Sequence, residues 1–366
     1  MRGCGRSGST AAANGCERFP DLGATVHCAE APEELAEELP ERYSSCFSVV
    51  EYFDLYDRPS QMCAVELDDP HHVVLFTVKG RTADVLNKVI DIEPEAVHRA
   101  EEAIFRAFPG VKRVRAEIKF PPEELRGPAR VTLRNDDLVI DLPATVAEYR
   151  ASLGKRTRQN INQYTNRLGR AHPDFHLVRF ERDEISFELV EKVAQWNTVR
   201  MRRRGLVSSF EAQPATMGPL WSLLQRYGLA LCGYIGDQCV AAQLVLCVGR
   251  DTWVHTVSFD SRYEDMHLGL LMAYFTVVES IERACSRVHM LWGTPVYKQR
   301  LGAKPVPAYQ VSLFRARSYK ILFAREKWHK DELNRIYWRT RHGVKRTVVG
   351  IAGVVRGSQP DDQRPA

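Results

Sequence analysis

The first third of the chain alternates apolar and polar residues with a period of two, the pattern of half-buried β-strands. Residues 47–56, 62–69, 71–80 and 111–120 are rich in β-branched and aromatic residues and are separated by turn residues. After Pro94 the period changes, and apolar residues up to Phe105 recur at helical spacing. We therefore predict strands in these four ranges and a helix that begins at Pro94.

The second half of the chain predicts longer helices that alternate with strands. We expect helices at residues 155–170, 183–205, 215–227 and 268–285, and strands at 229–236, 238–248, 252–260 and 288–291. Short turns join the first three of these strands, so they should be antiparallel. Residues 268–285 are apolar nearly all round, which indicates a buried helix. Because this helix separates 252–260 from 288–291, those two strands should be parallel neighbours.

The order strand, strand, helix, strand occurs twice, at residues 71–119 and again at 238–292. The sequence therefore predicts an α/β fold with a mixed (α+β) central sheet flanked by helices, built from two tandem copies of one unit. The expected parts are a poorly ordered N-terminus, a first copy, a second copy, a basic helical segment and a disordered tail, at residues 1–40, 41–143, 144–316, 317–350 and 351–366.

Charge is distributed unevenly between the two copies. The chain has 51 Lys and Arg against 46 Asp and Glu, a formal net charge of +5. Residues 1–130 hold 16 basic and 23 acidic residues (16 − 23 = −7), so the remainder carries +5 + 7 = +12. A basic second half favours an anionic partner: a phosphate-bearing cofactor, nucleic acid or acidic lipid.

Cysteine usage and hydropathy indicate a cytoplasmic protein. The nine cysteines include no pair at Cys-x-x-Cys spacing, so we expect neither disulfides nor a metal site. The first sixteen residues lack the apolar stretch of a signal peptide. No stretch reaches the roughly 20 apolar residues that span a bilayer.

Two junctions carry candidate chemistry. At residues 259–271 a strand ends, a polar loop follows, and Gly269 lies in the first turn of the buried helix. Exposed amides and the helix dipole could bind a pyrophosphate there; the alternative is that glycine only eases packing. At residues 289–304 a strand stops at Gly293 and Pro295, and Tyr297 and Lys298 follow side by side.

Three stretches together resemble the GNAT acyltransferase superfamily, from Leu138 to about Arg315. Residues 138–163 are similar to its entry strand and basic helix, and residues 259–282 to its cofactor loop and long helix. Residues 291–304 are similar to the closing Gly-x-x-x-Tyr-Lys-x-x-Phe/Leu-Gly signature. More narrowly, the chain resembles the bacterial CelD-like branch, which is related to the FemAB aminoacyltransferases.

The resemblance implies an acyl-coenzyme A, usually acetyl-CoA, between strands 252–260 and 288–292. Its pyrophosphate would meet the backbone at His267, Leu268, Gly269 and Leu270. Of the common Gln/Arg-x-x-Gly-x-Gly/Ala loop only Gly269 remains, and Leu268 stands where this branch often has proline.

Acyl transfer to an amine also needs a base and a donor for the leaving group. Asp260 and His255 are the nearest candidate bases; the alternatives are a loop-opening cap for Asp260 and a core position for His255. Tyr297 would hydrogen-bond the leaving thiolate or the substrate, and Lys298 would pair with a cofactor phosphate or an acidic acceptor. Alternatively, Tyr297 packs on the sheet and Lys298 is solvated.

Two basic regions remain outside this site. Residues 155–170 contain no acid and are interpreted as a solvated or interdomain helix. Residues 315–346 hold eleven Lys and Arg against three acids. This second region is interpreted as a helix docked on the domain, or as a peripheral contact with the inner membrane surface.

We expect an acetyl-CoA-dependent N- or O-acyltransferase that acts on a sugar, a sugar nucleotide or a cell-envelope precursor. One rival is an aminoacyl transferase of the FemAB kind that uses charged tRNA. The other is a non-catalytic basic binding module. If the protein is an acetyl-CoA-dependent acyltransferase, no nucleic-acid partner is expected.

Overall fold

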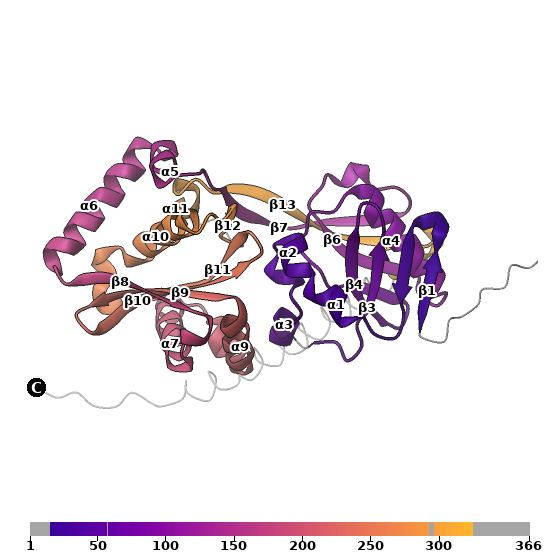
Figure 1. Ribbon diagram of the computed structural model, residues 1–366, viewed down its shortest axis with the longest axis horizontal. Coiled ribbons are helices and arrows are strands. Elements are labelled where there is room, and N and C mark those ends of the chain that lie inside the picture. The colour runs from indigo at the N-terminus through magenta and orange to yellow at the C-terminus, as the bar shows by residue number, and fades with distance from the viewer. Residues whose placement is uncertain (1–14, 57, 293–295, 325–366) are drawn as a thin grey trace, which may run out of the picture. The chain divides into compact units, whose positions relative to one another are not determined.

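The computed structural model describes residues 15–56, 58–292 and 296–324, and no described helix has the length and apolarity that crossing a membrane requires. The described residues up to Leu313 form one compact unit, and a second unit begins at Phe314. In the described residues thirteen strands form one mixed sheet, in the order β1-β2-β3-β4-β5-β6-β13-β7-β12-β11-β10-β9-β8 (Figure 1).

The described residues of the N-terminal copy form six strands and four α-helices. The strands are β1 (Cys16–Phe19), β2 (Ala24–His27), β3 (Cys63–Leu67), β4 (His72–Lys79), β5 (Thr82–Val85) and β6 (Arg113–Ile118). The helices are α1 (Glu33–Glu37), α2 (Leu39–Tyr43), α3 (Val50–Phe53) and α4 (Pro94–Ala107). Neighbouring strands from β1 to β5 are antiparallel, and β6 runs parallel to β5 after the α4 crossover. The apolar stripe of α4 packs on this sheet, as its spacing predicts.

In the part of the C-terminal copy that the structure describes there are seven strands and seven α-helices. The strands are β7 (Ala129–Asp141), β8 (Phe175–Glu181), β9 (Gly228–Ile235), β10 (Gln238–Val248), β11 (Asp251–Phe259), β12 (Arg287–His289) and β13 (Lys304–Phe314). The helices are α5 (Val146–Ser152), α6 (Lys155–Ala171), α7 (Phe187–Arg203), α8 (Ser209–Ala212), α9 (Met217–Tyr227), α10 (Leu268–Glu282) and α11 (Val296–Arg300). The helices α5, α6, α10 and α11 lie on one face of the sheet, and α7 and α9 on the other (Figure 1).

The predicted repeat is confirmed. The series β4-β5-α4-β6 and β10-β11-α10-β12 have the same order, with an antiparallel first pair and a parallel second pair in each. The sheet is continuous between the copies, because β7 pairs with β12 at one end and with β13 along the rest of its length. Since β13 lies between β6 and β7, the copies interlock in the sheet and do not separate at residues 143 and 144.

Two local predictions are wrong. Residues 15–40 were expected to be poorly ordered, but they form β1, β2, α1 and the start of α2. Residues 47–56 were expected to be a strand, but they form α3 between two turns of 3-10 helix. In that segment Val49 and Phe53 are both buried and are four residues apart, a spacing that also fits a helix.

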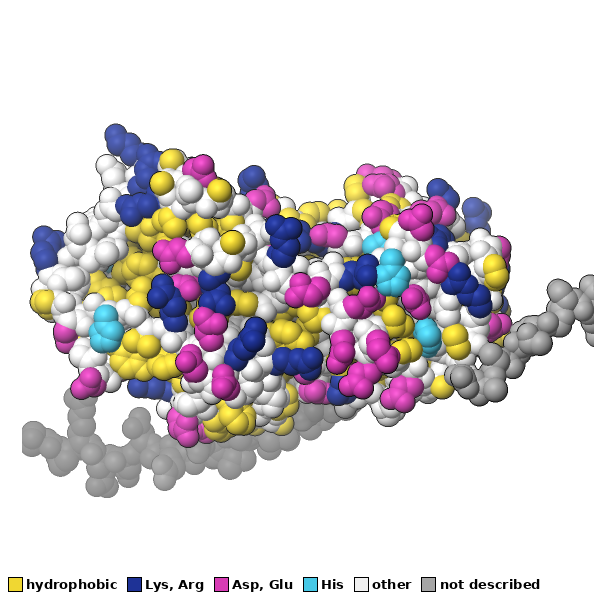
Figure 2. All heavy atoms as spheres, viewed as in Figure 1, with side chains coloured by type: hydrophobic (Ala, Val, Ile, Leu, Met, Phe, Trp, Pro, Cys, Tyr) yellow, Lys and Arg dark blue, Asp and Glu magenta, His cyan; other side chains and the backbone are white. Residues whose placement is uncertain are grey.

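The uneven charge predicted from the sequence is visible on the surface. In Figure 2, acidic side chains cluster over the N-terminal copy, while Lys and Arg side chains follow the outer edge where Figure 1 places α6. Helix α6 has no acidic residue, and its buried side is formed by Thr157, Ile161 and Leu168.

Candidate active site

The parallel strands β11 and β12 part after three residue pairs. Asp251, Thr252 and Trp253 pair with β12, whereas the rest of β11, up to Phe259, pairs only with β10. Beyond β12 the chain stays with β7 for one more residue, since the Met290 amide donates to the Leu138 carbonyl at 2.8 Å. Leu291 follows in the left-handed conformation (φ 54°). The two strands therefore cease to pair at the place where the resemblance implies a wedge, and we use the word wedge for this place below.

Lys298 holds this strand end in place. Its ammonium Nζ donates to the carbonyl oxygens of Met290 (2.6 Å), Leu291 (3.1 Å) and Trp292 (2.8 Å). The side chain is buried, and burial lowers the pKa of Lys298 to about 8, against the opposing effect of the Asp137 charge. We expected Lys298 to face a phosphate, an acidic acceptor or solvent. In the structure its ammonium instead donates to three backbone carbonyls.

Helix α10 begins beside the wedge with unpaired amides. His267, its N-cap, adopts the left-handed conformation (φ 55°), and its carbonyl accepts from the amides of Leu270 and Leu271. Among the described residues, the amides of Leu268 and Gly269 have no acceptor. The positive end of the helix dipole adds to these two donors, so this terminus suits an anion.

Gly269 also serves packing. A β-carbon built at this position would lie 3.1 Å from Cε1 of Phe259, the last residue of β11. The packing interpretation of the glycine therefore has a basis in the structure, because the missing side chain lets α10 approach β11. Leu268 is buried and Gly269 is partly exposed. His267 is exposed and stacks on Tyr164 of α6, with ring centroids 3.9 Å apart.

The loop before α10 is neutralised by ion pairs. Asp260 accepts from the backbone amide of Arg262 and pairs with its guanidinium at 2.7 Å. That guanidinium holds the pKa of Asp260 below its usual value. The structure thus gives Asp260 the cap role that was its alternative. Glu264 pairs with Arg203 of α7 and Asp265 with Arg167 of α6.

His255 lies in the part of β11 that has lost β12. The register with β10 shifts there, because Leu244 pairs with Thr256 and Val245 with Val254, which leaves His255 as the extra residue of a bulge. Burial lowers its pKa to about 4, so the imidazole is neutral at physiological pH. Its Nδ1 lies 2.9 Å from Oγ1 of Thr256, and its ring centroid lies 6.5 Å from that of Phe210.

Tyr297 packs against the core between α10 and the sheet, and the charge of Arg200 acts on its phenol. Tyr297 is half-buried on α11, and burial raises the pKa of its phenol. The nearest charge that opposes this rise is Arg200, which belongs to α7 on the other face. Sequence reasoning missed Arg200, because in the run Arg-Met-Arg-Arg-Arg it looks like one of several basic residues at a helix end.

The corresponding helix of the N-terminal copy does not suit an anion. The strands β5 and β6 also pair at three positions. However, α4 begins with Pro94, which has no amide, between Glu93 and Glu95. Glu93 lies 2.6 Å from Nε2 of His72. This difference supports the prediction that only the second copy could use its helix start.

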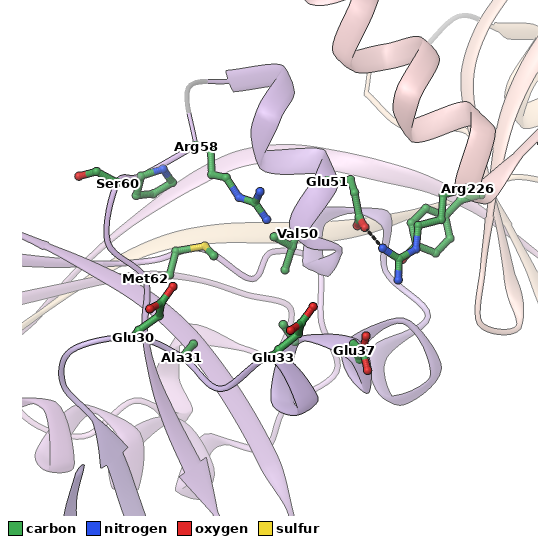
Figure 3. A pocket seen from close by; sticks show the side chains of 13 residues that line it. Glu30, Ala31, Glu33, Glu37, Val50, Glu51, Arg58, Ser60, Met62 and Arg226 are labelled. Carbon is green, nitrogen blue, oxygen red and sulfur yellow. Dashed lines mark hydrogen bonds and ion pairs between the residues drawn. The ribbon is translucent and has the colours of Figure 1, made fainter. Parts of the chain in front are cut away.

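A further cavity of about 440 Å³ is lined by residues of α1, α3 and the end of α9 (Figure 3). Glu30, Glu33 and Glu37 line it, and Arg226 is paired with Glu51 at its side. Because carboxylates predominate, this cavity does not suit a phosphate-bearing cofactor. Among the described residues no group of three His, Cys, Asp or Glu side chains is arranged to hold a metal ion.

Comparisons with known proteins agree with this geometry. Residues 155–299 match the family described as Acetyltransferase (GNAT) domain. A conserved protein of unknown function from Bacteroides thetaiotaomicron VPI-5482 has TM-score 0.55 at 13% identity, over 77% of this chain and 97% of that one. FemX has TM-score 0.57 at 8% identity, over 76% and 95%.

The C-terminal domain of a putative lysylphosphatidylglycerol synthetase from Agrobacterium fabrum has TM-score 0.51 at 9% identity, over 76% and 90%. At these identities the similarities establish the fold. A comparison with curated protein sequences finds no match. Residues 155–299 thus match a GNAT-type acetyltransferase domain, and the chain shares its overall fold with FemX.

Proposed function

We propose that the protein transfers an acyl group, most simply acetyl, from acyl-coenzyme A to an amine or hydroxyl of a sugar, a sugar nucleotide or a cell-envelope precursor. The observation that carries this proposal is the parting of β11 and β12 beside the start of α10, where two amides find no acceptor among the residues that the structure describes. The cofactor supplies an activated thioester and a diphosphate. The amides of Leu268 and Gly269 would hold that diphosphate, as helix termini hold phosphate elsewhere.

Tyr297 is assigned the role of proton donor to the leaving thiolate. Its phenol is half-buried at the wedge, and its raised pKa keeps it protonated at neutral pH. A protonated phenol can donate a hydrogen bond to sulfur as the negative charge develops there.

His255 is the better of the two predicted bases. Arg262 occupies the carboxylate of Asp260, whereas the His255 imidazole is neutral and retains a ring nitrogen that can accept a hydrogen bond. With a pKa of about 4, His255 would accept a hydrogen bond from the attacking group and orient it, and the proton that this group loses would pass to solvent water. Lys298 acts indirectly, since it fixes the strand end that forms one side of the wedge.

Calorimetric titration of the full chain with acetyl-CoA tests the donor. We expect a single saturable site, and release of free coenzyme A when an acceptor is added, detected with a thiol-trapping reagent. Absence of binding at millimolar acetyl-CoA would exclude this donor.

Aminoacyl transfer from charged tRNA is the second candidate, favoured by helix α6. Lys155, Arg156 and Arg170 are exposed on it, and no acid accompanies them. Filter binding of tRNA across a salt series tests this candidate, since a contact with several phosphates weakens steeply as salt increases. The membrane contact is predicted for residues 317–350, of which the structure describes only residues 317–324. This contact stays a proposal, as does a cytoplasmic location.

A further inference from the structure

Arg200 is a cation without a partner in the described structure. It lies on α7, the helix that packs on β11, and its side chain is half-buried. Its Nε atom is fully buried and has no hydrogen-bond acceptor among the described residues. The neighbouring arginines differ: Arg202 is paired with Glu211 at 2.6 Å and Arg203 with Glu264 at 3.3 Å.

This arrangement is unfavourable for the protein alone. Burial lowers the pKa of Arg200, and the like charge of Arg204, one turn further along the chain, lowers it further. Removing a guanidinium from water without supplying an anion costs free energy, because its lost hydration is not replaced. An anion supplied by a bound molecule would restore that balance.

The position of Arg200 indicates which molecule supplies the anion. The Arg200 charge also acts on Tyr297, the residue to which the proposed function assigns the thioester end of the site. The diphosphate of coenzyme A is assigned to the amides of Leu268 and Gly269, and the uncharged pantetheine arm separates that diphosphate from the thioester. An anion beside Tyr297 therefore belongs to the acceptor and not to the cofactor.

We propose that Arg200 binds an anionic group of the acceptor, a phosphate or a carboxylate, close to the nucleophile that attacks the thioester. This inference rests on the proposed function. The guanidinium is planar and donates two parallel hydrogen bonds to either oxyanion, a geometry that lysine does not reproduce. The favoured acceptors are sugar phosphates, nucleotide sugars and amino acids, in which an amine or hydroxyl lies a few bonds from the charge. A neutral sugar would leave Arg200 unpaired.

Titration calorimetry with inorganic phosphate, and separately with acetate, tests this site in full-length protein saturated with coenzyme A. Saturation with coenzyme A removes the α10 terminus from competition. We expect saturable binding of at least one anion, and the tighter of the two identifies the acceptor as a phosphate or a carboxylate. Arg200→Gln should weaken that binding at least tenfold and Arg200→Lys less, whereas Arg202→Gln, the matched control on the same helix, should leave it unchanged.

Equal anion affinity in wild type and Arg200→Gln would overturn the inference, as would failure of the wild type to bind either anion. A loss of coenzyme A affinity in Arg200→Gln would also overturn it, because Arg200 would then belong to the cofactor site. If the chain does not bind coenzyme A, the proposed function fails. The same titration on the Gly269→Asp variant, which blocks the α10 terminus, would then still test Arg200.

Discussion

Replacing Lys298 by methionine removes the three donors that hold the end of β12 while keeping a side chain of similar length. The ammonium donates to the carbonyls of Met290, Leu291 and Trp292, and these residues lead out of the strand. Methionine would fill the space and leave the three carbonyls without these donors. The variant therefore tests the effect of the three hydrogen bonds without a large change in side-chain volume.

The magnitude follows from two opposing contributions. Hydrogen bonds to a charged donor contribute about 1.5–3 kcal/mol each, so three sum to about 5–9 kcal/mol at most. Burial of the ammonium offsets part of this: a pKa of about 8 in place of 10.5 corresponds to about 3 kcal/mol. We expect Lys298→Met to lower the free energy of unfolding by the difference, about 2–6 kcal/mol at pH 7.

The pH dependence has a defined sign. The folded pKa of Lys298, about 8, lies below 10.5, so between these values the unfolded chain binds the additional proton. The stability of the wild type relative to the variant should therefore rise as the pH increases through this window.

Urea unfolding followed by tryptophan fluorescence measures the free energy of unfolding. Calorimetry with coenzyme A measures the affinity of the proposed cofactor site. Lys304→Met is the matched control, because Lys304 is exposed. If Lys298→Met is as stable as the wild type, the three bonds do not hold the strand end. If the variant is less stable but binds coenzyme A with unchanged affinity, Lys298 does not shape the site.

Three further predictions concern single side chains. Gly269→Asp should weaken acyl-CoA binding at least a hundredfold in calorimetry, because it places a carboxylate at the start of α10. Gly269→Ala controls for the contact with Phe259 that any side chain would make. Unchanged affinity in the aspartate variant would contradict the proposed site. Tyr297→Phe should lower kcat by about 10²-fold at unchanged KM for the donor, and an unaltered kcat would remove Tyr297 from catalysis. Burial raises the pKa of Glu101 in α4 to about 8 from 4.5, so between these pH values the folded chain binds more protons than the unfolded chain. The stability of the wild type should therefore fall as the pH rises from 5 to 8, and urea unfolding of Glu101→Gln should lack this loss. The same loss of stability in both proteins would refute the raised pKa.

The parts of the fold that local patterns encode were predicted correctly. The apolar helix α10 between β11 and β12 requires a crossover, and a crossover makes the two strands parallel. The same reasoning identified the β5-α4-β6 repeat. Thr145 and Glu148 form a capping box at the start of α5, a feature that depends only on local sequence.

Features that depend on long-range placement were not predictable. The position of β13 between β6 and β7 follows from pairing partners far away in sequence, and no local pattern specifies it. Lys298 looked like a surface residue because its acceptors are backbone carbonyls, which leave no signal in the sequence. The role proposed for Arg200 depends on Tyr297, which lies on a helix of the opposite face of the sheet, and no local pattern connects the two residues.

The central claim is that the space between β11 and β12 receives the acyl-coenzyme A at the start of α10. The most direct measurement is a crystal structure of the full chain grown with coenzyme A. The account predicts a diphosphate within hydrogen-bond distance of the amides of Leu268 and Gly269, with the thiol near Tyr297. Coenzyme A bound elsewhere on the chain, or β11 and β12 paired along their whole length in that crystal, would contradict it.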